Sequence, residues 1–107
     1  MKLKLVNLTP HPVVIVDQDA DILELPGCPT PPRVEETREF QGVVNGIPVN
    51  KVVMGQVRDL PEARPGTGYI VSRLVAETAR RPDLYIPDRT IRDDQGRIVG
   101  CMALAQV

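Results

Sequence analysis

An Asn-Gly pair at positions 45 and 46 constrains the fold more than any other feature of the chain. Val43 and Val44 precede this pair and Ile47–Val49 follows it, so the two residues lie between apolar segments. Asn and Gly readily adopt the two positive φ angles of a type I′ turn, which joins twisted antiparallel strands. The sequence therefore predicts a β-hairpin centred on Asn45 and Gly46.

Other segments also favour strands. Hydrophobic residues make up 42% of the chain but aromatic residues only 3%, so the core must consist of Val, Ile and Leu, a mixture that favours strands. Lys2–Asn7 and Val13–Asp17 are expected to pair as a hairpin, and the proline-rich segment Pro26–Pro32 is expected to be a stiff loop. Further strands are predicted at Ile22–Leu25, Arg33–Phe40, Lys51–Val57, Tyr69–Val71 and Leu84–Ile86, with a final pair at Ile91–Arg92 and Arg97–Leu104 around a turn at 93–96.

One helix is predicted, from Arg73 to Arg81. Ser72 is a suitable N-cap, because its hydroxyl can accept from backbone N–H groups of the first turn, and Pro82 follows the helix. A helix start delivered by a strand also suits a phosphate or carboxylate, because the helix dipole is positive there. The sequence thus predicts one ligand-binding domain over residues 1–107, with an α+β fold that has a mainly antiparallel β-sheet and one principal helix. The helix residues expected to face the sheet are Leu74, Val75 and Ala79.

Charge and apolar patterning argue against several partners. The net charge of −1 argues against binding a nucleic-acid polymer, which usually needs a basic face. The longest apolar run, Val13–Val16, is far below the roughly 18 residues of a membrane span, and the first eight residues do not resemble a secretory signal. A cytoplasmic protein without a membrane partner is predicted.

No metal or other cofactor is predicted. Cys28 and Cys101 lack C-x-x-C spacing and are too few for a disulfide framework, so we expect two reduced thiols, with Cys101 in the core. Asp17, Asp19 and Asp21 lack the glycine and the closing glutamate of a calcium loop, which indicates a solvated acidic turn.

Histidine and tyrosine are the first candidates for function. His11 is the single histidine, and neither G-x-S-x-G nor H-E-x-x-H occurs, so no catalytic residues are predicted. His11 is interpreted either as a turn residue between two prolines or as a ligand contact. Tyr69 and Tyr85 either offer flat faces to a nucleobase or fill the edge of the core.

Arginine is the other candidate. Every basic residue after Lys51 is arginine, whose guanidinium binds phosphate bidentately, although a GC-rich genome would give the same bias. Arg92 and Asp93, beside the predicted turn, either hold a phosphate and a ribose hydroxyl together or form an ion pair at the hairpin tip. Arg89 is grouped with them as a ligand-binding residue.

Three segments, LVNLTPHPVVI, GYIVSRLVA and IRDDQGRIVG, resemble small proteins carried by phages and prophages. In particular, the chain resembles the first-described Thoeris anti-defence family, whose members are oligomeric sponges that sequester cyclic ADP-ribose isomers. The resemblance implies tight binding without turnover, in the host cytoplasm if the chain is phage-encoded, and pockets where subunits of a homo-oligomer meet. It also implies that Tyr69 stacks on adenine and that Arg92 and Asp93 contact the ligand.

Three alternatives remain open from the sequence. A related sponge for cyclic dinucleotides or trinucleotides would use the same residues. A small nucleotide-processing enzyme would use His11 or an aspartate to activate water. A structural or protein-interaction module would need only exposed strand edges and no nucleotide.

Overall fold

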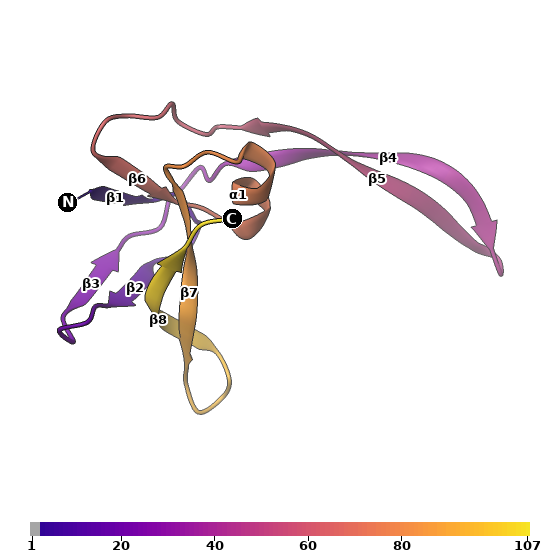
Figure 1. The fold of residues 1–107 in the computed structure, drawn as a ribbon. Helices are drawn as coiled ribbons and strands as arrows, with labels where there is room; N and C mark the ends of the chain where they lie inside the picture. The colour runs from indigo at the N-terminus through magenta and orange to yellow at the C-terminus, as the bar shows by residue number, and fades with distance from the viewer. Residues whose placement is uncertain (1–2) are drawn as a thin grey trace.

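The computed structural model describes residues 3–107 and is mostly β, with 54% of the residues in strands and one short helix (Figure 1). A body of six strands carries a long two-stranded hairpin that projects away from it. The elements in chain order are β1 (Lys4–Asn7), β2 (Val13–Val16), β3 (Ile22–Leu25), β4 (Arg33–Val44), β5 (Ile47–Arg58), β6 (Thr67–Ile70), α1 (Arg73–Ala79), β7 (Leu84–Arg92) and β8 (Ile98–Ala105).

The six-stranded sheet is a mixed, nearly closed barrel with the order β1-β6-β7-β8-β2-β3. The pairs β1–β6, β6–β7 and β2–β8 are parallel, whereas β2–β3 and β7–β8 are antiparallel. The prediction of a mainly antiparallel sheet is therefore correct only for the hairpins. The predicted hairpin between Lys2–Asn7 and Val13–Asp17 is wrong, because β1 pairs with β6 and β2 pairs with β3 and β8; Lys2 itself lies outside the described residues.

Asn7 connects the two edge strands that would otherwise leave the barrel open. It is the last residue of β1, and its Nδ2 donates to the carbonyls of Leu25 and Pro26, at 3.4 and 3.1 Å, where β3 ends. The same Nδ2 lies 2.8 Å from the His11 carbonyl, and its Oδ1 accepts from the backbone and the hydroxyl of Thr9. Asn7 is buried, so these partners satisfy polar atoms that have little access to water.

The core lies between α1 and the sheet. Its buried members are Leu8, Tyr69, Val71, Val75, Ala76, Leu84 and Ile86. Ser72 caps the helix as predicted, because its hydroxyl accepts from the backbone N–H of Val75 at 3.3 Å. The helix ends at Ala79, two residues before the predicted end, and Arg80 follows in the left-handed region with φ 50°. Leu74 is 41% exposed and does not face the sheet, because Val75 and Ala76 occupy the buried side of this two-turn helix.

The hairpin β4–β5, hereafter the arm, confirms the turn predicted at Asn45 and Gly46. Their φ angles are 51° and 79°, both positive as a type I′ turn requires. Each strand has 12 residues, so the predicted segments Arg33–Phe40 and Lys51–Val57 are parts of longer strands. At the base of the arm Val34 pairs with Val57, and both pack against the core.

Among residues 3–107, no helix is long and apolar enough to cross a membrane.

We expect Asn7→Ala to lower the free energy of unfolding by about 3 kcal/mol, because it removes the hydrogen bonds of a buried side chain to three partly buried carbonyl groups and to Thr9. Chemical denaturation followed by circular dichroism measures this change. Asn50→Ala is the matched control, since Asn50 is an exposed residue of the arm, and it should stay within about 0.5 kcal/mol of the wild type. Equal effects of the two substitutions would contradict the role of Asn7 in closing the barrel.

Candidate functional site

The turn between β7 and β8 is built around the side chain of Asp93. Its Oδ1 accepts from the backbone N–H groups of Gln95 and Arg97, at 2.9 Å each. Its Oδ2 lies 3.4 Å from Nε of Arg97. The predicted turn at 93–96 is confirmed, and within one chain the Asp93 carboxylate is bound to the turn itself. Asp93 therefore sets the geometry of the two strand ends.

Arg92 ends β7 beside this turn. One of its guanidinium N–H groups donates to the Gly96 carbonyl at 2.7 Å, across the turn. The side chain is exposed, and a guanidinium has five N–H donors, so most of its donors face solvent. In the described part of the chain, no carboxylate lies within 4.0 Å of the guanidinium of Arg92 or of Arg89.

Arg89 lies on the same strand, in an unusual backbone conformation. Its φ is 49°, whereas its neighbours Asp88 and Thr90 pair regularly with Ala103 and Cys101 on β8. A left-handed residue other than glycine costs roughly 1–2 kcal/mol, and such positions cluster at binding sites. Arg89 and Arg92 are therefore two exposed arginines three residues apart on one strand, hereafter the arginine pair.

The other predicted site residues lie elsewhere in the protomer. Tyr69 is 4% exposed, and its hydroxyl donates to the Glu62 carbonyl at 3.3 Å, so its ring faces are covered by the core. It is aligned with Leu84 at the start of β7, eight residues from Arg92, a separation of roughly 26 Å along a strand. One chain therefore does not bring Tyr69 and Arg92 together. His11 is exposed in the bend before β2, and its carbonyl accepts from Asn7.

Two further candidate sites from the sequence, Tyr85 and the start of the helix, have structural explanations. Tyr85 packs over Gly68, where an added Cβ would lie 2.8 Å from the tyrosine ring, so Gly68 is needed for close packing. The helix start is an unsuitable anion site, because α1 has only seven residues and the hydroxyl of Ser72 already accepts from its first turn. Among residues 3–107, no group of three His, Cys, Asp or Glu side chains is placed to hold a metal ion.

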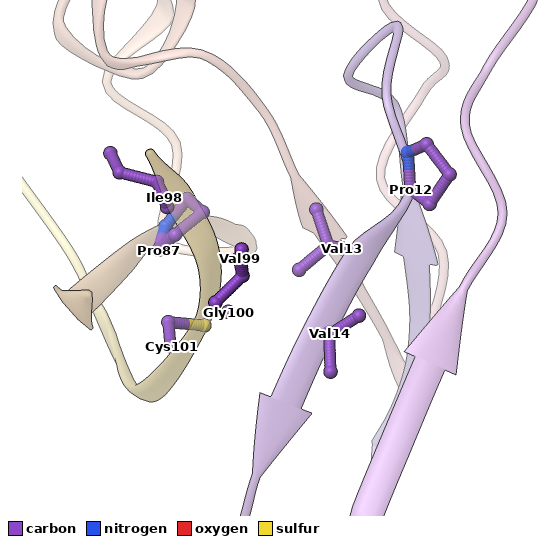
Figure 2. Close-up of a pocket in the computed structure, with 8 residues that line it drawn as sticks. All are labelled: Pro12, Val13, Val14, Pro87, Ile98, Val99, Gly100 and Cys101. Carbon is purple, nitrogen blue, oxygen red and sulfur yellow. The ribbon is translucent and has the colours of Figure 1, made fainter. Parts of the chain in front are cut away.

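An apolar cleft that the sequence did not reveal separates β2 from β8 (Figure 2). The two strands pair only where Ile15 meets Cys101, and they diverge beyond that point. The cleft has a volume of about 110 Å³ and is lined by Pro12, Val13, Val14, Pro87, Ile98, Val99, Gly100 and Cys101. Cys101 is a free thiol that is 1% exposed, which confirms its predicted place in the core, and burial raises its pKa.

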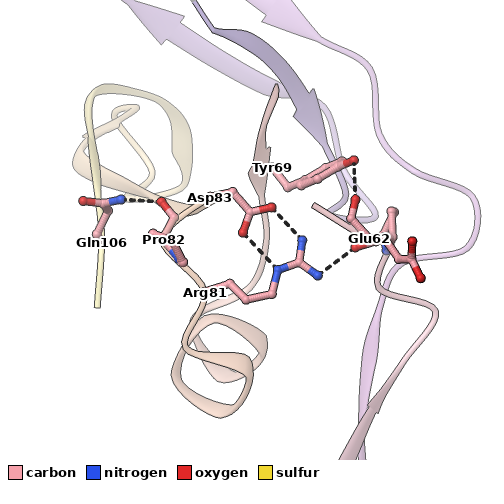
Figure 3. A network of polar contacts seen from close by, with 7 residues as sticks. Glu62, Tyr69, Arg81, Pro82, Asp83 and Gln106 are labelled. Carbon is pink, nitrogen blue, oxygen red and sulfur yellow. Dashed lines mark hydrogen bonds and ion pairs between the residues drawn. The ribbon is translucent and has the colours of Figure 1, made fainter. Parts of the chain in front are cut away.

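Arg81 and Asp83 form a bidentate ion pair after the helix (Figure 3). The two N···O distances are 2.9 and 2.6 Å, and a third guanidinium N–H donates to the Pro61 carbonyl at 2.8 Å. The hydrogen bond from Arg81 lowers the pKa of Asp83, and its partner carboxylate raises the pKa of Arg81. In the sequence, the only sign of this ion pair is the tripeptide Arg81-Pro82-Asp83, which was not among the predicted site residues. The pair fastens the loop after β5 to the start of β7.

No protein-family model, curated protein or solved structure matches the chain. Its function is therefore inferred from its own residues and from the resemblance described above.

We expect Asp83→Asn to lower the free energy of unfolding at pH 7 by about 2 kcal/mol, because Arg81 would keep its charge without a partner. For a domain of this size the melting temperature should fall by roughly 10 °C. The pKa of Asp83 is lowered in the folded state, so the stability that the pair contributes is present above the unfolded pKa and is lost as pH falls through the folded value. The difference between the two proteins should therefore shrink in acid.

Asp94→Asn is the matched control, because Asp94 is an exposed residue of the β7–β8 turn. It should change stability by less than about 0.5 kcal/mol. A loss for Asp83→Asn that is no larger than this would show that the ion pair does not hold the loop.

Proposed function

We propose that the protein is a phage-encoded sponge that binds a phosphate-bearing cyclic nucleotide, a cyclic ADP-ribose isomer in the first instance, and holds it without cleaving it. The single observation that carries the proposal is the arginine pair, Arg89 and Arg92. Both guanidinium groups are exposed, neither has a carboxylate within 4.0 Å in the described chain, and both lie on one strand of a fastened hairpin. Inhibition of a host defence that signals through such nucleotides follows from the family resemblance.

Phosphate chemistry supports this assignment. Guanidinium groups bind phosphate with two parallel hydrogen bonds, and these charge-assisted bonds are roughly twice as strong as neutral ones. Asp93 holds the backbone of the turn, so binding orders only the arginine side chains and not the turn itself, and less conformational entropy is lost than with a mobile loop. In this proposal Asp93 positions the arginines, and the contact between Asp93 and the ligand implied by the resemblance is not required.

The position of the arginine pair also favours a site at a subunit boundary. The pair lies at the outer end of β7, away from the core that surrounds Tyr69. A nucleotide bound there has one side open until another surface covers it. A homo-oligomer in the host cytoplasm supplies that surface in the proposed sponge. Cyclic dinucleotides and trinucleotides present the same phosphate groups and are the alternative ligands.

The test is a thermal shift with cyclic ADP-ribose isomers and, separately, with cyclic dinucleotides and trinucleotides. At a free ligand concentration one hundred times Kd, binding stabilises the folded state by about 2.7 kcal/mol. For a domain near this size the melting temperature should rise on the order of 10 °C. Mass spectrometry after heating should recover the ligand intact. A hydrolysed product would identify an enzyme, and the absence of a shift with every nucleotide would contradict the proposal.

We expect Arg92→Ala to abolish most of this shift while the unliganded melting temperature changes by about a degree, because Arg92 makes one exposed hydrogen bond at a turn. Arg73→Ala is the matched control: Arg73 is an exposed arginine paired with Glu77 on α1. It should keep the full shift. If Arg92→Ala instead destabilises the free protein strongly and still binds the nucleotide, the arginine is structural and the site lies elsewhere.

A further inference from the structure

The outer part of the arm is exposed but has the uncharged, apolar composition that is usual for a buried strand. Residues 40–50, which include the turn and both strand ends, contain no charged side chain. Phe40, Val43, Val44 and Ile47 are between 58% and 66% exposed. A soluble surface normally places charges on such a projecting hairpin, because exposed apolar strands invite pairing with other chains.

Both faces of the arm are apolar. Residues that pair across an antiparallel ladder lie on the same face, so Val44 and Ile47 share one face with Val49. On the opposite face Val43 is paired with Pro48, and Phe40 is paired with Asn50. A two-stranded ribbon is only marginally stable in water, and this one is anchored to the core at its base alone. The outer arm therefore needs cover on more than one side.

Its own body does not provide this cover. The arm extends away from the barrel (Figure 1), and its 12-residue strands span roughly 40 Å. The core contacts on the arm, Val34 and Val57, lie at the end opposite the turn.

We propose that the arm of one copy docks in the cleft between β2 and β8 of a second copy of the chain. Figure 2 shows Val13 and Val14 of β2 facing Val99 and Cys101 of β8 across this cleft. At about 110 Å³ the cleft is somewhat smaller than an apolar cavity of roughly 150 Å³ that admits benzene. It therefore fits a branched aliphatic side chain such as Val44 or Ile47. Exposed apolar residues at its rim, Ile98 and Val99, extend the surface beyond the cleft itself.

The charges favour a second copy over other occupants. Across residues 33–58 the arm has four basic side chains (Arg33, Arg38, Lys51, Arg58) and three acidic ones (Glu35, Glu36, Glu39), a difference of +1. This is too little to hold a nucleic acid, whose affinity depends on neutralising several phosphates. The whole chain has a net charge of −1, so two copies repel each other only weakly.

The available area is sufficient for an assembly. The exposed apolar side chains of the arm offer on the order of 600 Å² over its two faces, so one face and an acceptor of similar area bury about 600 Å² per contact, and the two contacts of a reciprocal dimer bury about 1,200 Å². This exceeds the roughly 1,000 Å² expected of a specific interface. Every copy carries both an arm and a cleft, so the contacts either close reciprocally as a dimer or run head to tail as a ring or an open filament. Ile98 at the rim is paired with Arg92, so a docked arm also lies beside the arginine pair.

Light scattering coupled to size exclusion, at about 20 μM protein without nucleotide, tests this inference independently of the proposed function. The wild type should be an oligomer of 11.8 kDa chains. Ile47→Glu on the arm and Val99→Glu at the cleft should each give a monomer with an unchanged circular dichroism spectrum. Leu74→Glu is the control, because Leu74 is a 41% exposed apolar residue on α1, outside both surfaces, and it should leave the mass unchanged.

Mixing the two monomeric variants gives the sharpest result. The Val99→Glu chain keeps its arm and the Ile47→Glu chain keeps its cleft, so one intact contact should produce a 1:1 pair. Both introduced side chains are acidic, so a new ion pair cannot explain recovery. A disulfide between Ile47→Cys on one chain and Val99→Cys on another would place the arm in the cleft directly.

Three results would overturn the inference. A wild type that is monomeric at 20 μM has no such contact. An oligomer that resists both glutamate substitutions assembles through another surface. If the wild type is a monomer that sediments with phosphatidylcholine vesicles, and the Ile47→Glu variant does not sediment with them, the arm binds lipid.

Discussion

The side chain of Asn7 holds together strands that have no ladder between them. β1 and β3 are the two edges of the six-stranded sheet, and Asn7 replaces strand pairing at this junction with hydrogen bonds to carbonyls where β3 ends. A backbone bond from the N–H of Cys28 to the Thr9 carbonyl, 2.7 Å long, reinforces the same seam. Gly27 is required beside it, since an added Cβ would lie 2.6 Å from the Pro10 carbonyl oxygen. The segment LVNLTPHPVVI, which carries part of the family resemblance, therefore has a structural role in closing the barrel.

Local signals in the sequence were sufficient for the hairpins that turn at 45–46 and at 93–96 and for the helix cap, whereas the pairing of β1 and β2 was not predictable. Asn45-Gly46 and Ser72 act through neighbours within three residues, so the sequence specified both correctly. The parallel pairing of β1 with β6 joins Lys4 to Thr67, and no local pattern encodes a partner that distant. The two prolines between β1 and β2 suggested a tight turn, but the segment crosses from one edge of the barrel to another strand of it.

For the candidate site, the sequence indicated the residue types but not their contacts or their burial. The sequence singled out Arg89, Arg92 and Asp93, and the structure places all three on or beside one hairpin. It could not show that Asp93 binds its own turn, because an aspartate before a turn and an aspartate at a ligand look alike in sequence. Nor could it separate a core tyrosine from a stacking one, since the burial of Tyr69 depends on where α1 and the loop at Glu62 pack.

The body of the protein buries its apolar residues, whereas the arm exposes them. The body buries an aliphatic core and satisfies its buried polar side chain, as a stable monomer must. The arm leaves its largest apolar residues, Phe40 and Ile47, in water at a cost that folding of one copy does not recover. The uncharged outer part of the arm, residues 40–50, would be an aggregation hazard unless assembly covers it. In the proposed assembly, docking of the arm in a cleft of limited volume turns this hazard into a defined contact, and it places a second surface beside the arginine pair, where the proposed anionic ligand would bind.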